Sequence, residues 1–325
     1  MSSIKIVKYS LKDYHLWNNF VAQAKNATFL FHRDYMEYHK DRFEDFSLMI
    51  FEKEELIALL PAHISGDKIF SHNGLTYGGL ICQSKLRTTD FVEIFYHLMK
   101  FLHENAISQW FWKEIPNFYT TNGNDELKYL TFVTEAKLYR RDLCSVIDLK
   151  QKIPTTHGLN WKVNKAKKAG AIIEKSTNFS FFWNEILSVE LLEKYGVKPV
   201  HSLEEIQFLH DKFPENIHLY TVKLNDEIVA GTVLYIDKKT VHCQYISVKK
   251  EYRNLRILDF LFHHLIFEKF SNFDYFDFGI SNEENGKKLN KGLMEFKENF
   301  GARSVSQDFY QLETKKYSLI ESLYL

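Results

Sequence analysis

Apolar and polar positions alternate along the N-terminal half in runs that predict an α/β fold. Residues 46–51 and 56–64 are rich in strand-forming apolar residues, and the polar stretch 52–55 between them predicts a turn. Residues 89–106 instead carry apolar side chains at helical spacing, which predicts an amphipathic helix. The other elements predicted for this half are a strand at 4–9, a helix at 12–25, a helix or turn at 28–38, a glycine-punctuated strand region at 68–81, and strands at 110–115 and 143–149.

A second series of elements follows the polar stretch 150–158, where Pro154 and Gly158 predict a domain boundary. Because both halves combine helices with antiparallel strands, we expect two α/β domains in tandem, at 1–150 and 151–325. Each is expected to hold a mixed, mainly antiparallel sheet flanked by helices. The second series comprises helices at 159–169, 179–194, 202–212 and 255–270, strands at 171–175, 217–224, 228–236, 240–248 and 273–278, and a short final helix closed by Gly301.

Composition and charge narrow the classes of protein that the pattern allows. Of the 325 residues, 45% are hydrophobic and 26% are charged, which is a globular profile. Lys+Arg and Asp+Glu both number 42, and this balance argues against a protein that coats DNA or other nucleic acid through its overall charge, while a local basic patch stays open. The three cysteines are dispersed, the N-terminus has no signal-peptide core, and no window is apolar enough to span a bilayer. We therefore expect a cytoplasmic protein.

Several familiar catalytic and binding motifs are missing from the sequence. No CxxC pair and no HExxH motif occur, so we expect no metal site, although His32 and His39 could share a helix face. No GxSxG motif occurs, which excludes the common serine-hydrolase arrangement. The sequence also lacks a Walker loop and a dinucleotide-binding GxGxxG motif.

The stretch 292–301 carries one lysine, Lys297, between Phe296 and Phe300. It follows an aromatic strand at 273–278 and a polar loop. On spacing alone, Lys297 is either a solvated lysine between two core anchors or a cation held in a low-dielectric cleft. A cation in such a cleft would stabilise negative charge that develops in a reaction.

Four segments together resemble the FemABX-like group, whose members carry two Gcn5-related N-acyltransferase (GNAT) domains in tandem. The resemblance covers nearly the whole chain and implies an enzyme that transfers an acyl or aminoacyl group to an amine. The four segments are 61–79 with its final Tyr-Gly-Gly, the basic helix 161–170, the strand end 277–281, and the closing Phe-Lys-x-x-Phe-Gly of 292–301.

Three residues are the catalytic candidates. The resemblance implies that Lys297 steadies negative charge on the donor or the oxyanion. Asp277 would orient or deprotonate the incoming ammonium, or it would simply cap the loop that follows. Tyr245 and His242 are acid–base candidates, but strand alternation turns their side chains to opposite faces, so only one of them can point into a given cleft. Tyr245 ranks ahead of His242 because a lone histidine on a strand is usually structural.

The donor site is expected where strand 240–248 ends and the next helix begins. GNAT acetyltransferases carry a glycine-rich loop there, but this chain has Arg253-Asn254-Leu255-Arg256 and lacks the glycines. The two arginines would bind phosphate through their side chains, or they are ordinary surface residues at a helix start. We therefore expect Val248, Arg253, Asn254 and Arg256 to contact the donor.

Six residues are expected at the acceptor site. Lys165 lies on a basic helix that would hold a phosphorylated acceptor or a tRNA backbone, or would form a solvated face. The polar loop after the aromatic strand forms the rim of the site. The expected contacts are His72, Asn73, Tyr77, Lys165, Ser281 and Asn282.

The favoured function is an N-acyltransferase with acyl-CoA, expected to be acetyl-CoA, as a co-substrate and with no permanently bound cofactor. The acceptor would be the amine of an amino sugar, which can be nucleotide-linked, or of another cell-envelope precursor, attacking directly in a ternary complex. An aminoacyl-tRNA-dependent transferase is the runner-up, because the two short helices within 179–212 do not form an extended tRNA-binding arm. A non-catalytic binding protein that retains the tandem fold is the alternative from another class.

Overall fold

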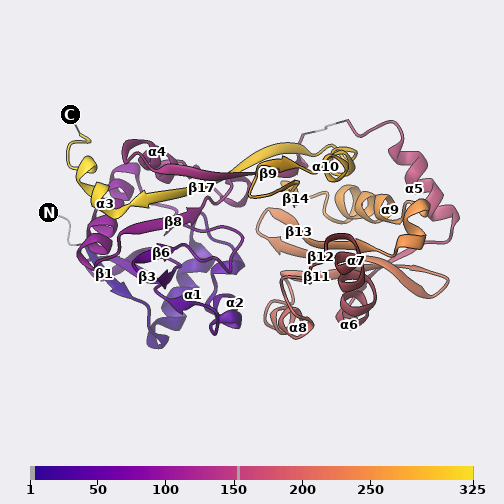
Figure 1. Ribbon diagram of the computed structural model, residues 1–325, viewed down its shortest axis with the longest axis horizontal. Helices are drawn as coiled ribbons and strands as arrows, with labels where there is room; N and C mark the ends of the chain where they lie inside the picture. Colours follow the sequence, from indigo (N-terminus) through magenta and orange to yellow (C-terminus); the bar gives the residue numbers. More distant parts are fainter. Residues whose placement is uncertain (1–3, 152–153, 325) are drawn as a thin grey trace. The chain divides into compact units, whose positions relative to one another are not determined.

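The computed structural model describes residues 4–151 and 154–324 and divides into two compact units (Figure 1). The first takes the chain up to Asp142 and again from Ser306, and the second takes Leu143–Val305. The chain passes between the units within β9 (Lys137–Asp148) and returns within β17 (Arg303–Glu313).

The C-terminal residues from Ser306 therefore belong to the first unit, although the sequence placed them in the second domain. The physical reason is the length of β17, which continues far enough to pair with β8 (Gln109–Lys113). Figure 1 shows this end of β17, in yellow, running beside β8. Of the expected linker 150–158, residues 152 and 153 lie outside the described residues.

The first unit contains two groups of paired strands. One has the order β1-β3-β4-β7 and is antiparallel throughout, and the other has the order β17-β8-β6-β5-β2, in which only the β6–β8 pair is parallel among the described pairings. Helix α3 packs its apolar face into a core with Trp110 and Trp112. Besides β8, β9 and β17, the helices and strands of the first unit are β1 (Ile4–Lys8), α1 (Tyr14–Gln23), α2 (Arg33–Met36), β2 (Glu44–Asp45), β3 (Leu48–Glu52), β4 (Glu55–Leu60), β5 (His63–Ser65), β6 (Lys68–Phe70), β7 (Ile81–Cys82), α3 (Thr88–Glu104) and α4 (Glu126–Val133).

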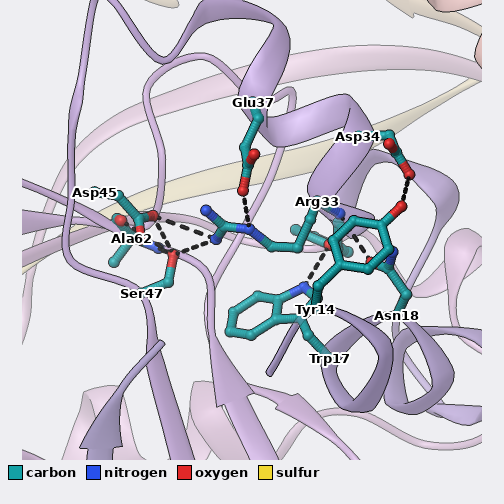
Figure 2. A network of polar contacts seen from close by, with 10 residues as sticks. Tyr14, Trp17, Asn18, Arg33, Asp34, Glu37, Asp45, Ser47 and Ala62 are labelled. Atoms are coloured by element: carbon teal, nitrogen blue, oxygen red, sulfur yellow. Dashed lines mark hydrogen bonds and ion pairs between the residues drawn. The ribbon is translucent and has the colours of Figure 1, made fainter. Parts of the chain in front are cut away.

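A buried arginine joins the helices of the first unit to its strands. Figure 2 shows the Arg33 guanidinium between Glu37 on one side and Asp45 with Ser47 on the other. The Nε–Oε1 distance to Glu37 is 2.9 Å and the Nη1–Oδ1 distance to Asp45 is 3.3 Å. The guanidinium also lies 3.8 Å from the Tyr9 ring centroid, so charge pairing and ring contact together compensate its burial.

The second unit is a mixed sheet with the order β10-β11-β12-β13-β14-β9. All neighbouring strands are antiparallel except β13 and β14, which run parallel. Helices α5, α9 and α10 share a core with one face of the sheet, and Phe262, Phe278 and Phe300 lie in it. The elements are α5 (Leu159–Lys168), β10 (Ile172–Ser176), α6 (Phe179–Phe181), α7 (Ser188–Tyr195), α8 (Leu203–Lys212), β11 (Ile217–Leu224), β12 (Glu227–Asp237), β13 (Thr240–Val248), α9 (Ile257–His264), β14 (Tyr275–Ile280), β15 (Asn282–Glu283), β16 (Lys288–Leu289) and α10 (Lys291–Glu298).

A π-helical segment, Phe182–Leu187, joins α6 to α7 and contacts β12 and β13. The contact is close because β12 carries Gly231, where an added Cβ would lie 2.8 Å from the Phe182 ring. A methyl group does not fit at that distance, so the glycine allows the helix to pack directly on the strand.

Two irregularities shape the centre of this sheet. The β12–β13 register shifts by one residue, so that Val233 pairs with Tyr245 and Leu234 with Cys243, which leaves Gln244 as a bulge. The parallel β13–β14 pairing covers Thr240–His242 against Tyr275–Asp277. Beyond these three residues no further β13–β14 pair occurs in the described part of the chain, and the ends of the two strands separate.

Within residues 4–151 and 154–324, no helix has both the length and the apolar character that crossing a membrane would require. The three cysteines are buried and unbridged.

Candidate active site

A groove of about 410 Å³ lies in the second unit, between the end of β13, the start of α9 and the helices α7 and α10. It includes three of the four residues predicted to contact the donor, Val248, Arg253 and Arg256, but not Asn254. The lining residues are Glu190, Leu191, Lys194, Tyr195, Ile246, Ser247, Val248, Arg253, Arg256, Ile257, Leu258, Asp259, Asn290, Gly292, Leu293 and Phe296.

Arg256 begins α9 in an unusual backbone conformation. Its φ of 63° and ψ of 34° are left-handed, a region that glycine adopts at little cost and other residues rarely adopt. Arg256 thus keeps a glycine-like backbone in the segment where the resemblance led us to expect a loop glycine. The side chain is exposed and makes no side-chain hydrogen bond to the part of the chain that the structure describes. A guanidinium at a helix N-terminus is well placed for an anion.

Arg253 reaches across the groove to helix α7. Its guanidinium pairs with the carboxylate of Glu190 on α7. On α9 itself, Oδ1 of Asp259 lies 3.4 Å from the Nζ of Lys162 on α5, and burial raises the pKa of the Asp259 carboxyl despite the nearby lysine. Of the predicted arginines, Arg256 is therefore the one without a carboxylate bonded to it.

Lys297 is buried in α10, with 4% of its surface exposed, which contradicts the solvated alternative. Its Nζ donates to the carbonyl oxygens of Gly279 at 3.0 Å and Ile280 at 2.6 Å. Burial lowers the pKa of this ammonium to about 8, and the nearby Asp277 opposes the shift. The ammonium therefore holds the end of β14 and brings a readily lost positive charge to the place where the two parallel strands separate.

Asp277 is paired with His242. The His242 Nδ1 lies 2.8 Å from Asp277 Oδ2, and the Gly279 backbone N–H donates to Asp277 Oδ1 at 2.7 Å. The carboxylate thus both caps the strand end, as one reading of the sequence predicted, and orients an imidazole. The sequence singled out Asp277 but did not predict that its carboxylate pairs with His242.

The prediction that His242 and Tyr245 face opposite sides of the sheet is wrong. The bulge at Gln244 adds one residue between them, and simple alternation fails across it. Val241 and Cys243 before the bulge, like Val248 after it, lie in the core shared with α9. His242 and Tyr245 therefore lie on the same face, and the sequence carries no signal for this shift.

Tyr245 is packed in a hydrogen-bonded pair. Its hydroxyl lies 2.6 Å from His201 Nδ1 and accepts the His201 backbone N–H at 3.2 Å, with the Trp183 ring alongside. Burial raises the pKa of the phenol to about 12. A phenol with this pKa stays protonated near neutral pH, and Tyr245 is not among the groove-lining residues.

The acceptor residues predicted in the second unit lie at separate places. Ser281 Oγ is 3.0 Å from Ser145 Oγ, and the Asn282 side chain accepts the Leu143 backbone N–H at 2.6 Å, so both tie the chain after β14 to β9. Lys165 lies on α5 over the exposed Trp161 ring, with its Nζ 5.5 Å from the ring centroid. Trp161 and Lys165 therefore lie on the same face of α5.

Of the acceptor residues predicted in the first unit, His72 and Tyr77 are buried, whereas Asn73 is exposed. His72 is buried with a φ of 55°, and burial lowers its pKa to about 2. Asn73 donates its backbone N–H to His63 and accepts Lys113 at its carbonyl oxygen. The Tyr77 hydroxyl donates to Thr28 at 3.0 Å.

Comparison with known protein families indicates the class of protein to which the second unit is similar. Residues 195–297 match the sequence model of the acetyltransferase (GNAT) domain family. No curated protein matches the chain. The family match lies within the second unit and confirms the expectation of an acyltransferase.

Solved structures confirm the fold. The chain is similar to FemX, with 13% identity, a TM-score of 0.64, and coverage of 98% of this chain and 100% of that one. It is also similar to the C-terminal domain of a putative lysylphosphatidylglycerol synthetase from Agrobacterium fabrum, with 12% identity, a TM-score of 0.58, and coverage of 95% and 93%. The third is L-PGS from Bacillus licheniformis, with 13% identity, a TM-score of 0.55, and coverage of 85% and 87%. The chain thus has the FemABX-like tandem GNAT fold, as the resemblance implied.

Proposed function

We propose that this protein is an N-acyltransferase that takes an acyl group from acyl-CoA, with acetyl-CoA as the first donor to test, and transfers it to an amine. The acceptor class we favour is an amino sugar or another cell-envelope precursor. The observation that carries the proposal is the groove at the end of β13, where Arg256 and the N-terminus of α9 offer cationic and N–H groups to a donor phosphate.

The walls of the groove suit the rest of such a donor. Ile246, Val248, Leu293 and Phe296 give it apolar walls along which a pantetheine arm can run. The strand backbone at and after the bulge offers N–H groups near a thioester carbonyl, which would stabilise the oxyanion of a tetrahedral intermediate. In this proposal, Lys297 adds positive charge at the strand separation, and Tyr245 packs against His201 and Trp183.

The aminoacyl-tRNA-dependent transferase is retained as a second candidate because of one observation. Arg256 and Leu258 place side chains in the groove where glycine-containing GNAT loops leave space, which narrows the approach of a pyrophosphate. The similarity to FemX and to lysylphosphatidylglycerol synthetases agrees with aminoacyl transfer. In this version the groove would hold the aminoacylated 3′ end of a tRNA.

A thiol-release assay tests the proposal. The protein is incubated with acetyl-CoA and a panel of amines that includes amino sugars, nucleotide-linked amino sugars, and ethanolamine as a headgroup probe, and free CoA is measured. Amine-dependent release that is lost in Gly292→Trp supports the proposal, because an added side chain at Gly292 has open space ahead of it and would fill the groove. Transfer from charged tRNA in the absence of CoA turnover would support the second candidate. No transfer from either donor would overturn both and favour a binding protein.

A further inference from the structure

His242 and the buried Asp277 form a hydrogen-bonded pair at the point where β13 and β14 separate. They are direct partners in the parallel register and the last pair in it among the described residues. Asp277 is 2% exposed and both of its oxygens accept hydrogen bonds, from the Gly279 backbone N–H and from the imidazole. A carboxylate fixed at both oxygens holds the ring in one orientation.

This pairing fixes where the proton of the imidazole lies. Because an ionised carboxylate only accepts hydrogen bonds, Nδ1 must carry the hydrogen, which leaves the lone pair of a neutral His242 on Nε2. That nitrogen makes no hydrogen bond to the described residues, and it is not among their buried atoms that lack a partner. With 13% of the side chain exposed, the free lone pair faces solvent rather than the core.

The surrounding residues leave room for this ring. A Cβ on Gly279 would lie 3.3 Å from His242 Cε1, so a side chain at that position would crowd the imidazole. Gly279 also has a φ of 70°, and its carbonyl oxygen accepts Lys297. The ring of Tyr235 on β12 also lies beside the imidazole, with its centroid 6.4 Å from that of His242.

We propose that His242 is the catalytic base that removes a proton from the acceptor, and that Asp277 is the positioning residue behind it. The proposal rests on the proposed N-acyltransferase function. An amine arrives as R–NH3⁺, and His242 Nε2 takes one proton to form an imidazolium that Asp277 stabilises. The freed nitrogen lone pair bonds to the acyl carbon, the C–S bond breaks with its electrons going to sulfur, and the second N–H proton neutralises the thiolate through water. The imidazolium then returns its proton to solvent.

Amines that differ only in protonation separate this role from a structural one. His242→Gln and Asp277→Asn are assayed with acetyl-CoA and either propylamine, a cation at neutral pH, or methoxyamine, which is neutral. We expect kcat/KM with propylamine to fall about a hundredfold, and with methoxyamine to fall only a few-fold. His264→Gln is the matched control, since His264 pairs with Glu268 at 2.7 Å on the surface of α9 and should retain wild-type rates. Equal losses with both amines would overturn the proposal while leaving the acyltransferase function intact.

A second readout needs no turnover. In long-range ¹H–¹⁵N spectra of the full-length protein at neutral pH, His242 should be the Nδ1–H tautomer in the wild type. It should convert largely to Nε2–H in Asp277→Asn, because the new amide can donate to Nδ1. An Nε2–H tautomer in the wild type would overturn the proposal. If no amine is acylated, the proposed N-acyltransferase function is wrong. The tautomer of His242 then still tests whether Asp277 orients the imidazole as proposed.

Discussion

The Lys297 ammonium donates to the Ile280 carbonyl oxygen at 2.6 Å and to that of Gly279 at 3.0 Å, so one side chain of α10 holds the end of β14. The contact lies where β14 loses its register with β9, between Asp277 and Ile280. The residue singled out for its charge is thus also the polar link between the closing helix and the strand that carries Asp277.

Replacing Lys297 with methionine is expected to destabilise the protein. The substitution keeps most of the volume but removes the ammonium donor of the Gly279 and Ile280 carbonyl oxygens, and a hydrogen bond from a charged donor contributes about 1.5–3 kcal/mol. Urea unfolding followed by tryptophan fluorescence would measure the loss. Lys291→Met is the matched control on the same helix, because its side chain is exposed and should change stability little. Equal stability of both variants would show that the two carbonyl bonds do not matter.

The same lysine predicts a pH dependence. Since burial lowers its pKa from 10.5 to about 8, the folded state releases a proton that the unfolded state keeps between these values. The penalty for burying the charge is therefore fully present below pH 8 and is relieved as pH rises toward 10.5, by about 3 kcal/mol at most. The difference in unfolding free energy between wild type and Lys297→Met should change in this direction across the window. A difference that is independent of pH would contradict the shifted pKa.

The first unit should lose stability in acid through its buried histidines. Burial lowers the pKa of His63 to about 4 and that of His72 to about 2, below the ordinary 6.5. Below pH 6.5 these two histidines bind protons in the unfolded chain but stay neutral in the folded protein. Their contribution to the free energy of unfolding therefore falls as the pH drops toward 4. His72→Asn, which tolerates the left-handed φ at this position, should flatten the acid limb of the stability curve. An unchanged acid limb would place the sensitivity elsewhere.

Arg256→Gly separates backbone strain from ligand binding. Glycine removes the cost of the left-handed φ, so the variant should be more stable than wild type by up to about 1 kcal/mol in thermal unfolding. If the guanidinium binds a donor phosphate, the same variant should bind CoA about tenfold more weakly, as expected for one lost charge-assisted contact. Arg87→Gly, at an exposed residue of the first unit that precedes α3, is the control for binding. A more stable variant with unchanged affinity would show that Arg256 is only a surface residue at a helix start.

The sequence predicted the α/β class and most elements, because apolar spacing and glycine punctuation are local properties. It also identified the region of the groove, since Val248, Arg253 and Arg256 lie where a strand passes into a helix. It misjudged the relationship of His242 to Tyr245, because one bulged residue reverses the alternation and no composition marks it. The His242–Asp277 and Lys297–Ile280 contacts join residues 35 and 17 positions apart, and only the folded sheet brings them together.

The central claim is that the groove beside β13 binds the acyl donor. Its most direct test is isothermal titration of acetyl-CoA into wild type, Gly292→Trp and Gly158→Trp, all in one buffer. At both glycines a new Cβ has no neighbour closer than 4.0 Å, but only Gly292 lines the groove. We expect one binding site in wild type and in Gly158→Trp, and an affinity about a hundredfold weaker in Gly292→Trp. No binding to wild type, or equal binding by all three proteins, would contradict it.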